Sequence, residues 1–284
     1  MPRYGSDHLR LPAAESAEGQ SAAIAGVLYI ILMSGLNDDT AKERSEKEMS
    51  FLVAVHVNEG IVLASDRRTT YTNTQTIDNK VVQRIGIHTT NSTDKTFACP
   101  NGAGISCCGD ASLLGKPITG FIQDMIRTEI SEDCQIGSMP QLIIDYFNRL
   151  PVVPNTNFIV AGYDSIDGKK TQKIFKFNVQ SKKIEQIDTA SQGATWDGET
   201  LTLTRLIQNV AVKTANNNYL DLPFEEILWS YFTLQDAVDF ARYAVETTIQ
   251  TMRFKNVVET VGGAVDVLVI TPDKTTWLQK ESIR

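Results

Sequence analysis

The stretch that decides the fold is SFLVAVHVNEGIVLASDRR, residues 50–68. Two apolar runs rich in β-branched residues, Phe51 to Val57 and Ile61 to Ser65, are separated by the polar turn Asn58-Glu59-Gly60. Two such runs joined by a short turn that contains glycine are typical of a β-hairpin. The stretch therefore predicts a pair of antiparallel strands, and the strong structural signals of the chain begin here.

Downstream of this hairpin, the hydrophobic pattern alternates between strand-like blocks and pairs of amphipathic helices. Hairpin connections favour antiparallel sheets over a doubly wound parallel sheet. The pattern predicts an α+β fold: a four-layer αββα sandwich in which two antiparallel sheets stack face to face between helices. We expect one domain over residues 50–284. The predicted helices are Ala111–Ile130, Gln141–Leu150, Glu199–Lys213 and Leu234–Met252, and the later strands are 97–98, 104–108, 157–163, 173–179, 183–188, 264–271 and 275–279.

The composition argues against several classes of function. A formal net charge of −7 and the absence of a Lys/Arg-rich run argue against a nucleic-acid-binding protein. The four cysteines include no CxxC pair, and Cys107 and Cys108 are adjacent, which favours reduced thiols in an intracellular protein over a disulfide framework. The three histidines form no HExxH motif, so we predict neither a zinc site nor another metal or cofactor.

Residues 1–49 differ in character from the rest of the chain. Their one apolar stretch, Ala22 to Met33, is shorter than the ~20 residues that a membrane-spanning helix needs, so we expect no membrane anchor. Two alternatives remain open for this leader. It is either a propeptide that is removed from the mature protein, or a segment upstream of the true start at Met49. The second is compatible with Glu43-Arg44-Ser45, which a purine-rich ribosome-binding tract can encode.

Five short motifs occur in an order that resembles the β subunits of proteasomes, a family of N-terminal-nucleophile (Ntn) hydrolases. The resemblance covers nearly all of the chain after Met49, and it extends to the compact bacterial homologues sometimes called ancestral β subunits. Each motif is weak alone, and their common order carries the resemblance. The motifs are Gly60–Arg68, Asp78–Val82, Cys108–Ala111, Ala190–Gly193 and Gly262–Val267.

The resemblance implies that Ser50 is the nucleophile of an amide hydrolase. In the family, the nucleophile is the first residue of the mature chain, sixteen positions before the acidic residue of the Asp-Arg-Arg element. The residue sixteen positions before Asp66 is Ser50. Ser50 follows Met49, so removal of this methionine, or of the whole leader, frees its α-amine. Lys80 is implied as the cation beside the nucleophile, and Asp66 as the partner of Lys80.

A free N-terminal serine carries its own base. Its α-amine has an ordinary pKa of about 7.7–8.0 and can accept the hydroxyl proton near neutral pH. A neighbouring lysine cation lowers the pKa of the hydroxyl and favours the neutral amine. The expected reaction is attack on an amide carbonyl, formation of an acyl-enzyme ester, and hydrolysis. A Ser/His/Asp triad built on His56 or His88 is the competing arrangement, although no Gly-x-Ser-x-Gly motif accompanies it.

The resemblance also implies what surrounds Ser50. A backbone N–H at Ser106 is the expected oxyanion donor. Glu259 is the expected substitute for an aspartate that the family has before its Gly-Gly pair, and Ala194 stands where the family has a serine after the Ser-x-Gly turn. The expected pocket for the substrate side chain is roomy and uncharged. Its implied lining is Thr69, Val82, Gly104, Cys108 and Ser112, with Gly104 at the floor.

Three functions remain open on the sequence. The first is a self-compartmentalising, autoprocessing peptidase of the threonine-protease type in the cytoplasm, which acts on peptides or proteins and assembles with copies of itself into a ring or an open spiral. The second is a narrower amidase, or a transpeptidase, that uses the same acyl-enzyme. The third is a non-catalytic assembly protein with the same fold. An unfoldase partner would suit the first function, and no residue identifies one.

Overall fold

The computed structural model describes residues 50–77 and 80–281, which fall into two units. The smaller unit holds residues 209–224, in which β13 (Ala211–Lys213) and β14 (Tyr219–Asp221) form an antiparallel pair. The larger unit holds the other described residues and contains the candidate site. The predicted leader, residues 1–49, lies outside the described residues, and so do residues 78–79 of the second motif.

The first sheet of the larger unit is built around the predicted hairpin. Strands β1 (Phe51–Val57) and β2 (Gly60–Asp66) pair in antiparallel register with Val57 opposite Gly60, which confirms the hairpin. A Cβ at residue 60 would lie 2.9 Å from the carbonyl oxygen of Ile270, so this turn requires glycine. The strand order is β12-β1-β2-β15-β16, with β12 at Gly193–Gly198, β15 at Val265–Ile270 and β16 at Thr275–Gln279.

The second sheet has the order β11-β10-β9-β6-β5, and each neighbouring pair is antiparallel. Its longest pairing is the hairpin of β9 and β10. Two further hairpins, β3 with β4 and β7 with β8, belong to neither sheet. The bounds are β3 Thr69–Ile77, β4 Lys80–Thr90, β5 Thr96–Ala98, β6 Gly104–Gly109, β7 Ser112–Leu113, β8 Lys116–Pro117, β9 Thr156–Ile166, β10 Lys169–Asn178 and β11 Ile184–Gln186.

The helices agree with the predicted order but not with all predicted bounds. The first begins only at Ile118, because Leu114 and Gly115 adopt positive φ and turn the chain between β7 and β8. The helix predicted over 199–213 ends at Ile207, because Gln208 is extended and β13 follows. None of the described helices is long and apolar enough to cross a membrane. The helices are α3 Ile118–Glu129, η1 Ile136–Ser138, α4 Met139–Asn148, α5 Leu201–Ile207, η2 Trp229–Tyr231 and α6 Leu234–Met252.

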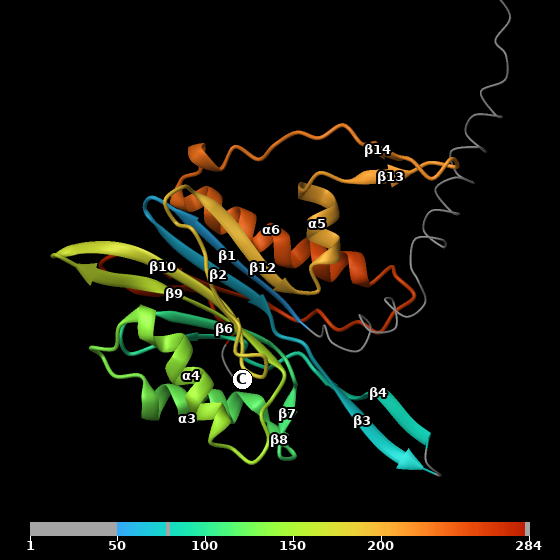
Figure 1. The fold of residues 1–284 in the computed structure, drawn as a ribbon, viewed down its shortest axis with the longest axis horizontal. Coiled ribbons are helices and arrows are strands. Elements are labelled where there is room, and N and C mark those ends of the chain that lie inside the picture. Colours follow the sequence, from blue (N-terminus) through green and yellow to red (C-terminus); the bar gives the residue numbers. More distant parts are fainter. Residues whose placement is uncertain (1–49, 78–79, 282–284) are drawn as a thin grey trace, which may run out of the picture. The chain divides into compact units, whose positions relative to one another are not determined.

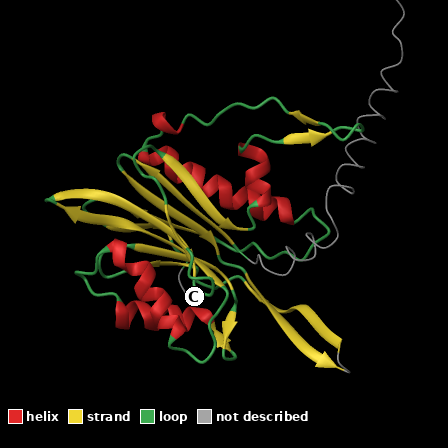
Figure 2. Cartoon of the chain, in the orientation of Figure 1, coloured by secondary structure: helices red, strands yellow, loops and turns green. Residues whose placement is uncertain are grey.

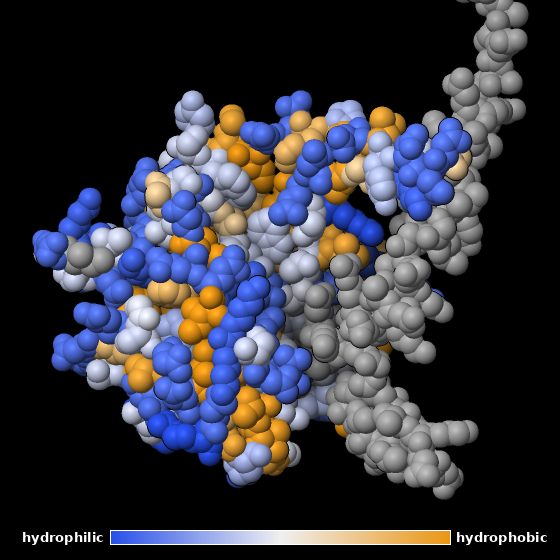
Figure 3. All heavy atoms as spheres, viewed as in Figure 1, coloured by the Kyte–Doolittle hydropathy of each residue, from blue (hydrophilic) through white to orange (hydrophobic). Residues whose placement is uncertain are grey.

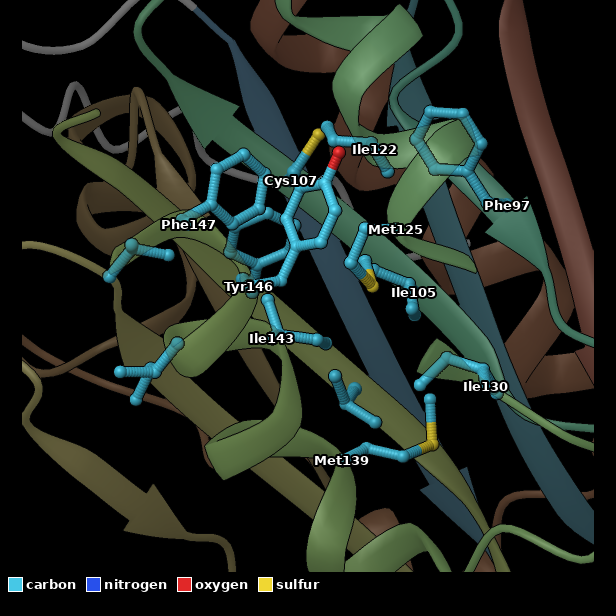
Figure 4. Close-up of a cluster of buried hydrophobic side chains, with 14 of the residues drawn as sticks. Phe97, Ile105, Cys107, Ile122, Met125, Ile130, Met139, Ile143, Tyr146 and Phe147 are labelled. Atoms are coloured by element: carbon cyan, nitrogen blue, oxygen red, sulfur yellow. The ribbon is translucent and has the colours of Figure 1, made fainter. Parts of the chain in front are cut away.

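The direction of the side chains divides the larger unit into layers. Successive strand residues point to opposite faces, so Val53 belongs to the apolar cluster that includes Ala241 of α6, while Leu52 belongs to the cluster that includes Ile159 of the second sheet. Phe158 points the other way and belongs to the cluster that includes Met125 of α3 and Ile143 of α4. Figure 4 shows these last two side chains among their neighbours. The order is therefore helix, sheet, sheet, helix, which confirms the predicted α+β sandwich (Figures 1 and 2).

Candidate active site at Ser50

Ser50 lies immediately before β1 and is 5% exposed. Its carbonyl oxygen accepts a hydrogen bond from the backbone N–H of Glu199 at 2.7 Å. Gly198 has a φ of +84°, and a Cβ on it would lie 2.0 Å from the same oxygen. Only glycine fits that contact. The end of β12 therefore holds the backbone of Ser50 in place.

Asp66 ends β2 beside Ser50 and is completely buried. Its Oδ1 accepts hydrogen bonds from the backbone N–H of Phe51 at 3.0 Å and from Nζ of Lys95 at 2.7 Å. Its Oδ2 accepts from the backbone N–H groups of Arg68 at 3.0 Å and Gly262 at 2.9 Å. Four donors thus satisfy the carboxylate of this buried residue. One of its two oxygens connects the residue after Ser50 to a lysine.

The lysine that contacts Asp66 is Lys95, and this corrects the prediction of Lys80. Lys80 begins β4 opposite Ile77, at the last described pair of the β3–β4 ladder, and its side chain lies outside those described. The base of the hairpin pairs Thr69 with Thr90, so Lys80 is roughly 25 Å along the strands from that base at ~3.3 Å per residue. The β3–β4 hairpin lies in the sequence between Asp66 and Lys95. A short motif does not show that a hairpin of this length is inserted there.

A buried ion-pair network supports the segment that carries Lys95. Arg67 Nη1 lies 2.7 Å from Asp94 Oδ1 and 2.8 Å from Asp266 Oδ2. Nζ of Lys280 bridges the same two carboxylates at 2.8 and 3.1 Å. The side chains of Arg67 and Asp266 are 4% and 0% exposed. Removing one partner of such a pair leaves a buried charge uncompensated. Because Asp94 belongs to the network and directly precedes Lys95, the network also positions Lys95.

Ser50 and Lys95 line one cavity, whose volume of about 20 Å³ suffices for roughly one water molecule. The structure brings two of the predicted pocket residues, Thr69 and Cys108, to this cavity. Burial raises the pKa of the neighbouring Cys107 thiol to about 12, although the Lys95 cation opposes the shift. Cys107 is therefore a neutral thiol at physiological pH. The other lining residues are Thr93, Asp94, Gly109, Asp110, Ala111, Ile118 and Thr156.

Gly104 does not form the floor of this cavity, which corrects its predicted role. A Cβ on Gly104 would lie 2.6 Å from Leu63 Cδ1, 2.8 Å from Ile270 Cδ1 and 2.9 Å from Leu268 Cδ2. Glycine is present because the two sheets approach closely there. Ser112 of β7 is exposed and is not among the lining residues, while the side chain of Val82 lies outside those described.

Ser106 is completely buried in β6 and does not line the cavity. Its Oγ is 2.9 Å from Oγ1 of Thr96, which is 2.8 Å from Oγ of Ser65. These hydroxyls form a buried chain from one sheet to the other. The cavity is lined instead by the next residues along the chain, from Cys107 to Ala111. This segment, and not Ser106, therefore borders the space beside Ser50.

Glu259 pairs with Arg68 and not with a group of the cavity. Its Oε2 lies 2.6 Å from Arg68 Nη1, and its side chain is 45% exposed. Glu259 is not among the residues that line the cavity at Ser50. The prediction that Glu259 takes the place of an aspartate beside Ser50 is therefore corrected. The glutamate side chain reaches Arg68 at the surface, while the Arg68 backbone N–H donates to Asp66.

The turn beside Ser50 is Asp197-Gly198, and not the predicted Ser191-Gln192-Gly193. Gly193 pairs with His56 at the far end of β1, whereas Gly198 pairs with Phe51. Ala194 likewise lies opposite Val55. The alanine that replaces the expected serine is therefore not beside Ser50. The Asp-Gly dipeptide is a turn signal that the sequence contains. The Ser-x-Gly motif therefore lies at the end of β12 that is remote from Ser50.

Asp197 forms a second charge pair that the sequence analysis missed. Its Oδ2 lies 3.7 Å from Nζ of Lys176, and its Oδ1 accepts hydrogen bonds from Asn157 Nδ2 at 3.1 Å and from the Gly198 backbone N–H at 2.7 Å. Burial raises the pKa of Cys108, Asp197 raises it further, and the Lys95 and Lys176 cations oppose the rise. The charges of Lys95, Lys176 and Asp197 therefore all affect the pKa of Cys108.

Neither histidine of the competing triad is beside Ser50. His56 occupies the opposite end of β1, and His88 stacks on Tyr71 with ring centroids 5.8 Å apart. Neither lines the cavity that contains Ser50. Among the described residues, the cavity at Ser50 is lined by the cation Lys95 and by no imidazole.

Comparison with known proteins shows a similarity to solved structures. No family model and no curated protein matches the chain. Among solved structures, the chain is similar to the Anbu (Gly-1) mutant from Hyphomicrobium sp. strain MC1, with a TM-score of 0.48 and 15% sequence identity over 82% of this chain and 86% of that chain. At this identity the similarity concerns the fold alone, and the chemistry of the chain depends on the residues around Ser50.

Proposed function

We propose that the chain is an N-terminal-serine amide hydrolase that becomes active when the residues before Ser50 are removed. The observation that carries this proposal is the contact of Asp66 with both the backbone of Phe51 and Nζ of Lys95. Because Ser50 and Lys95 also line one cavity, a buried cation is held beside a serine at the start of its strand. The resemblance of residues 60–68 to the proteasome β-subunit signature supports the same assignment.

The chemistry requires the α-amine of Ser50. Removal of Met49 leaves this amine free, and near neutral pH a large part of it is unprotonated. The amine takes the proton of the Ser50 hydroxyl as the hydroxyl oxygen attacks an amide carbonyl, and it then protonates the departing amine. Water cleaves the resulting ester and regenerates the serine. The Lys95 cation stabilises the developing negative charge on the serine oxygen and disfavours a second positive charge on the amine.

The segment 107–111 takes the role first assigned to Ser106. A backbone N–H of this segment would stabilise the oxyanion, because the segment lines the cavity at Ser50 and Ser106 does not. The Lys176–Asp197 pair lies at the end of β12 that holds Ser50, where it positions the turn at Gly198. Asp66 positions Lys95 in the same way from β2.

The small cavity favours a narrow-specificity amidase as the second candidate function. About 20 Å³ is too small for a large substrate side chain. A substrate with a small residue on the acyl side of the cleaved bond fits this space as it stands. A broad peptidase would need the segment 107–111 or Thr69 to move. Turnover of a peptide library that varies the acyl-side residue separates the two functions.

We also propose a cytoplasmic homo-oligomer, a ring or a spiral. Large hydrophobic side chains are exposed before and after α6: Leu228 (63%), Tyr231 (79%), Phe254 (84%) and Val257 (55%). Hydrophobic patches also interrupt the hydrophilic surface on the face shown in Figure 3. Such exposure is typical of protein contact surfaces. All four cysteines are free, which suits a reducing compartment. Light scattering tests the assembly, and a monomer at micromolar concentration would contradict it.

The decisive experiment examines residue 50 directly. Intact-mass and N-terminal analysis of the native protein should give a chain that begins at Ser50. A peptide epoxyketone, which reacts with both a hydroxyl and an adjacent α-amine, should label that chain once. Ser50→Ala, produced with the same N-terminus, is the matched control and should remain unlabelled. A native chain that always retains Met49, or an unlabelled chain that begins at Ser50, would support the non-catalytic assembly protein instead.

A further inference from the structure

A second cavity of the larger unit lies at the end of the two sheets that is remote from Ser50. It has a volume of about 510 Å³, within the usual range of small-molecule pockets. The β1–β2 turn, the β9–β10 hairpin and residues 186–192 line it. In Figure 1 the turn and the hairpin extend to the same, left-hand end of the sheets. At ~3.3 Å per residue, β1 places this cavity roughly 20 Å from Ser50.

His56 lines this cavity, and the hairpin register explains why. It follows Leu52 and Ala54 on the face of β1 that points between the sheets. Its side chain is 3% exposed and borders the cavity. The imidazole therefore lies where a molecule bound in the cavity can contact it.

The charged groups around His56 favour an anion. Lys169 and Lys170 at the tip of the β9–β10 hairpin line the cavity, and Asp188 is the one acidic residue of its lining. Oδ1 of Asp188 already accepts the backbone N–H of Ala190 at 2.9 Å. Burial lowers the pKa of His56, and Asp188 opposes that shift. A neutral imidazole has one N–H to donate. The two adjacent lysines give this cavity more positive than negative charges, although the chain has a net charge of −7.

Hydrogen bonds between separate segments hold the cavity open. Nε2 of Gln172 donates to the carbonyl oxygen of Val57 at 2.6 Å and to the hydroxyl of Tyr163 at 3.1 Å, which leaves the hydroxyl proton of Tyr163 free to be donated. Oε1 of Gln192 accepts the backbone N–H of Asn58 at 2.7 Å. The β1–β2 turn is thereby tied to both other walls. Such a site is preformed, which limits the entropy lost on binding.

We propose that this cavity binds a small carboxylate-bearing molecule, whose carboxylate accepts hydrogen bonds from His56 and Tyr163 and pairs with Lys169 and Lys170. A single negative charge matches the two lysines set against one aspartate. The uncharged remainder of the molecule contacts Val57, Ile187 and Pro272. The proposal does not depend on the hydrolase activity of Ser50, because the two cavities share no lining residue.

The test is a nuclear magnetic resonance titration of the full chain with benzoate and with its neutral isostere benzamide. The chain has only three histidines, so the Cε1–H signal of His56 is identified by its loss in His56→Gln. Benzoate at millimolar concentration should shift this signal and raise the pKa of His56, because a carboxylate stabilises the imidazolium. Benzamide should bind about tenfold more weakly.

Paired variants test the lysines. Lys169→Gln with Lys170→Gln should weaken benzoate binding at least several-fold. Lys182→Gln with Lys183→Gln, two adjacent exposed lysines in another turn of the same sheet, should leave it unchanged. The proposal is overturned if benzamide binds as tightly as benzoate, if neither moves the His56 signal, or if both lysine pairs have the same effect. Thermal unfolding of each variant shows that the fold is retained.

Discussion

Nζ of Lys95 lies 2.7 Å from Oδ1 of Asp66, and the two side chains are only 5% and 0% exposed. The same carboxylate oxygen accepts the backbone N–H of Phe51, the residue after Ser50. A buried pair of this kind is costly to break, because the remaining partner keeps its charge without compensation. The pair therefore ties the strand that carries the candidate nucleophile to a cation.

Replacement of Lys95 should abolish the reactivity of Ser50, whereas replacement of Lys80 should not. Lys95→Met should lower the rate of epoxyketone labelling about 10²-fold or more, since the hydroxyl loses its charged neighbour. It should also cost about 3–5 kcal/mol of stability, because the buried Asp66 carboxylate loses its cationic partner. Lys80→Gln should change neither quantity. Labelling is measured by mass spectrometry on the folded fraction, and loss of labelling in Lys80→Gln alone would restore Lys80 as the catalytic lysine.

Gly198 should not tolerate a side chain. Gly198→Ala places a Cβ 2.0 Å from the carbonyl oxygen of Ser50, at a φ of +84°. We expect a loss of more than about 2 kcal/mol in the free energy of unfolding, and a strong loss of Ser50 labelling. Gly168→Ala is the control, because Gly168 has a similar φ of +76° but no atom within 4 Å of its Cβ. It should cost only about 1–2 kcal/mol. Equal losses in urea denaturation would mean that the contact with Ser50 contributes nothing.

The Lys176–Asp197 pair should affect Ser50 more than it affects stability. Both side chains are about a fifth exposed, so the pair itself contributes only about 1 kcal/mol or less. Asp197→Asn removes the charge but retains an oxygen for the Gly198 N–H. We expect slower labelling and a shifted pH profile of labelling, with partial recovery in the double variant with Lys176→Met. Unchanged labelling across pH 6–9, about the window in which an α-amine titrates, would limit the pair to a structural role.

The thiols of the candidate site should resist alkylation. Burial raises the pKa of Cys107 to about 12 and also raises that of Cys108, so both thiols stay protonated throughout the neutral range. Only the thiolate is a nucleophile. Iodoacetamide at pH 7.5 should therefore modify the partly exposed Cys134 first, and peptide mapping by mass spectrometry locates the adduct. Modification of Cys107 before Cys134 would show that the site opens in solution.

The β1–β2 hairpin is the part of the fold that the sequence predicted best. Its two apolar runs and the turn at residues 58–60 require no information from elsewhere in the chain, and the observed strands agree with them. The relation of Ser50 to Asp66 follows from the same local register, because Leu52 pairs with Ser65. A hairpin brings together residues that are close in the sequence, so a local pattern is sufficient to predict their pairing.

The other parts of the candidate site depend on segments that are distant in the sequence. Lys80 matched a motif, but the long β3–β4 hairpin returns the chain so that Lys95 reaches Asp66. Gly104 resembled a pocket floor, but Leu63, Leu268 and Ile270 converge on it from two other strands. Neither the role of Lys95 nor the packing of Gly104 can be predicted from the spacing of motifs in the sequence. Insertions change that spacing, and residues that pack together are often far apart in the chain.

The sequence by itself determined the α+β class, the first hairpin and the position of Ser50 before Asp66. These depend on the period-2 pattern of strands and on short-range turn chemistry. Only the tertiary structure decided that Lys95 is the buried cation, that Asp197-Gly198 is the turn beside Ser50, and that His56 lines a second cavity. Those facts arise where two sheets stack and strands far apart in the chain become neighbours, and no local pattern encodes which strands these are.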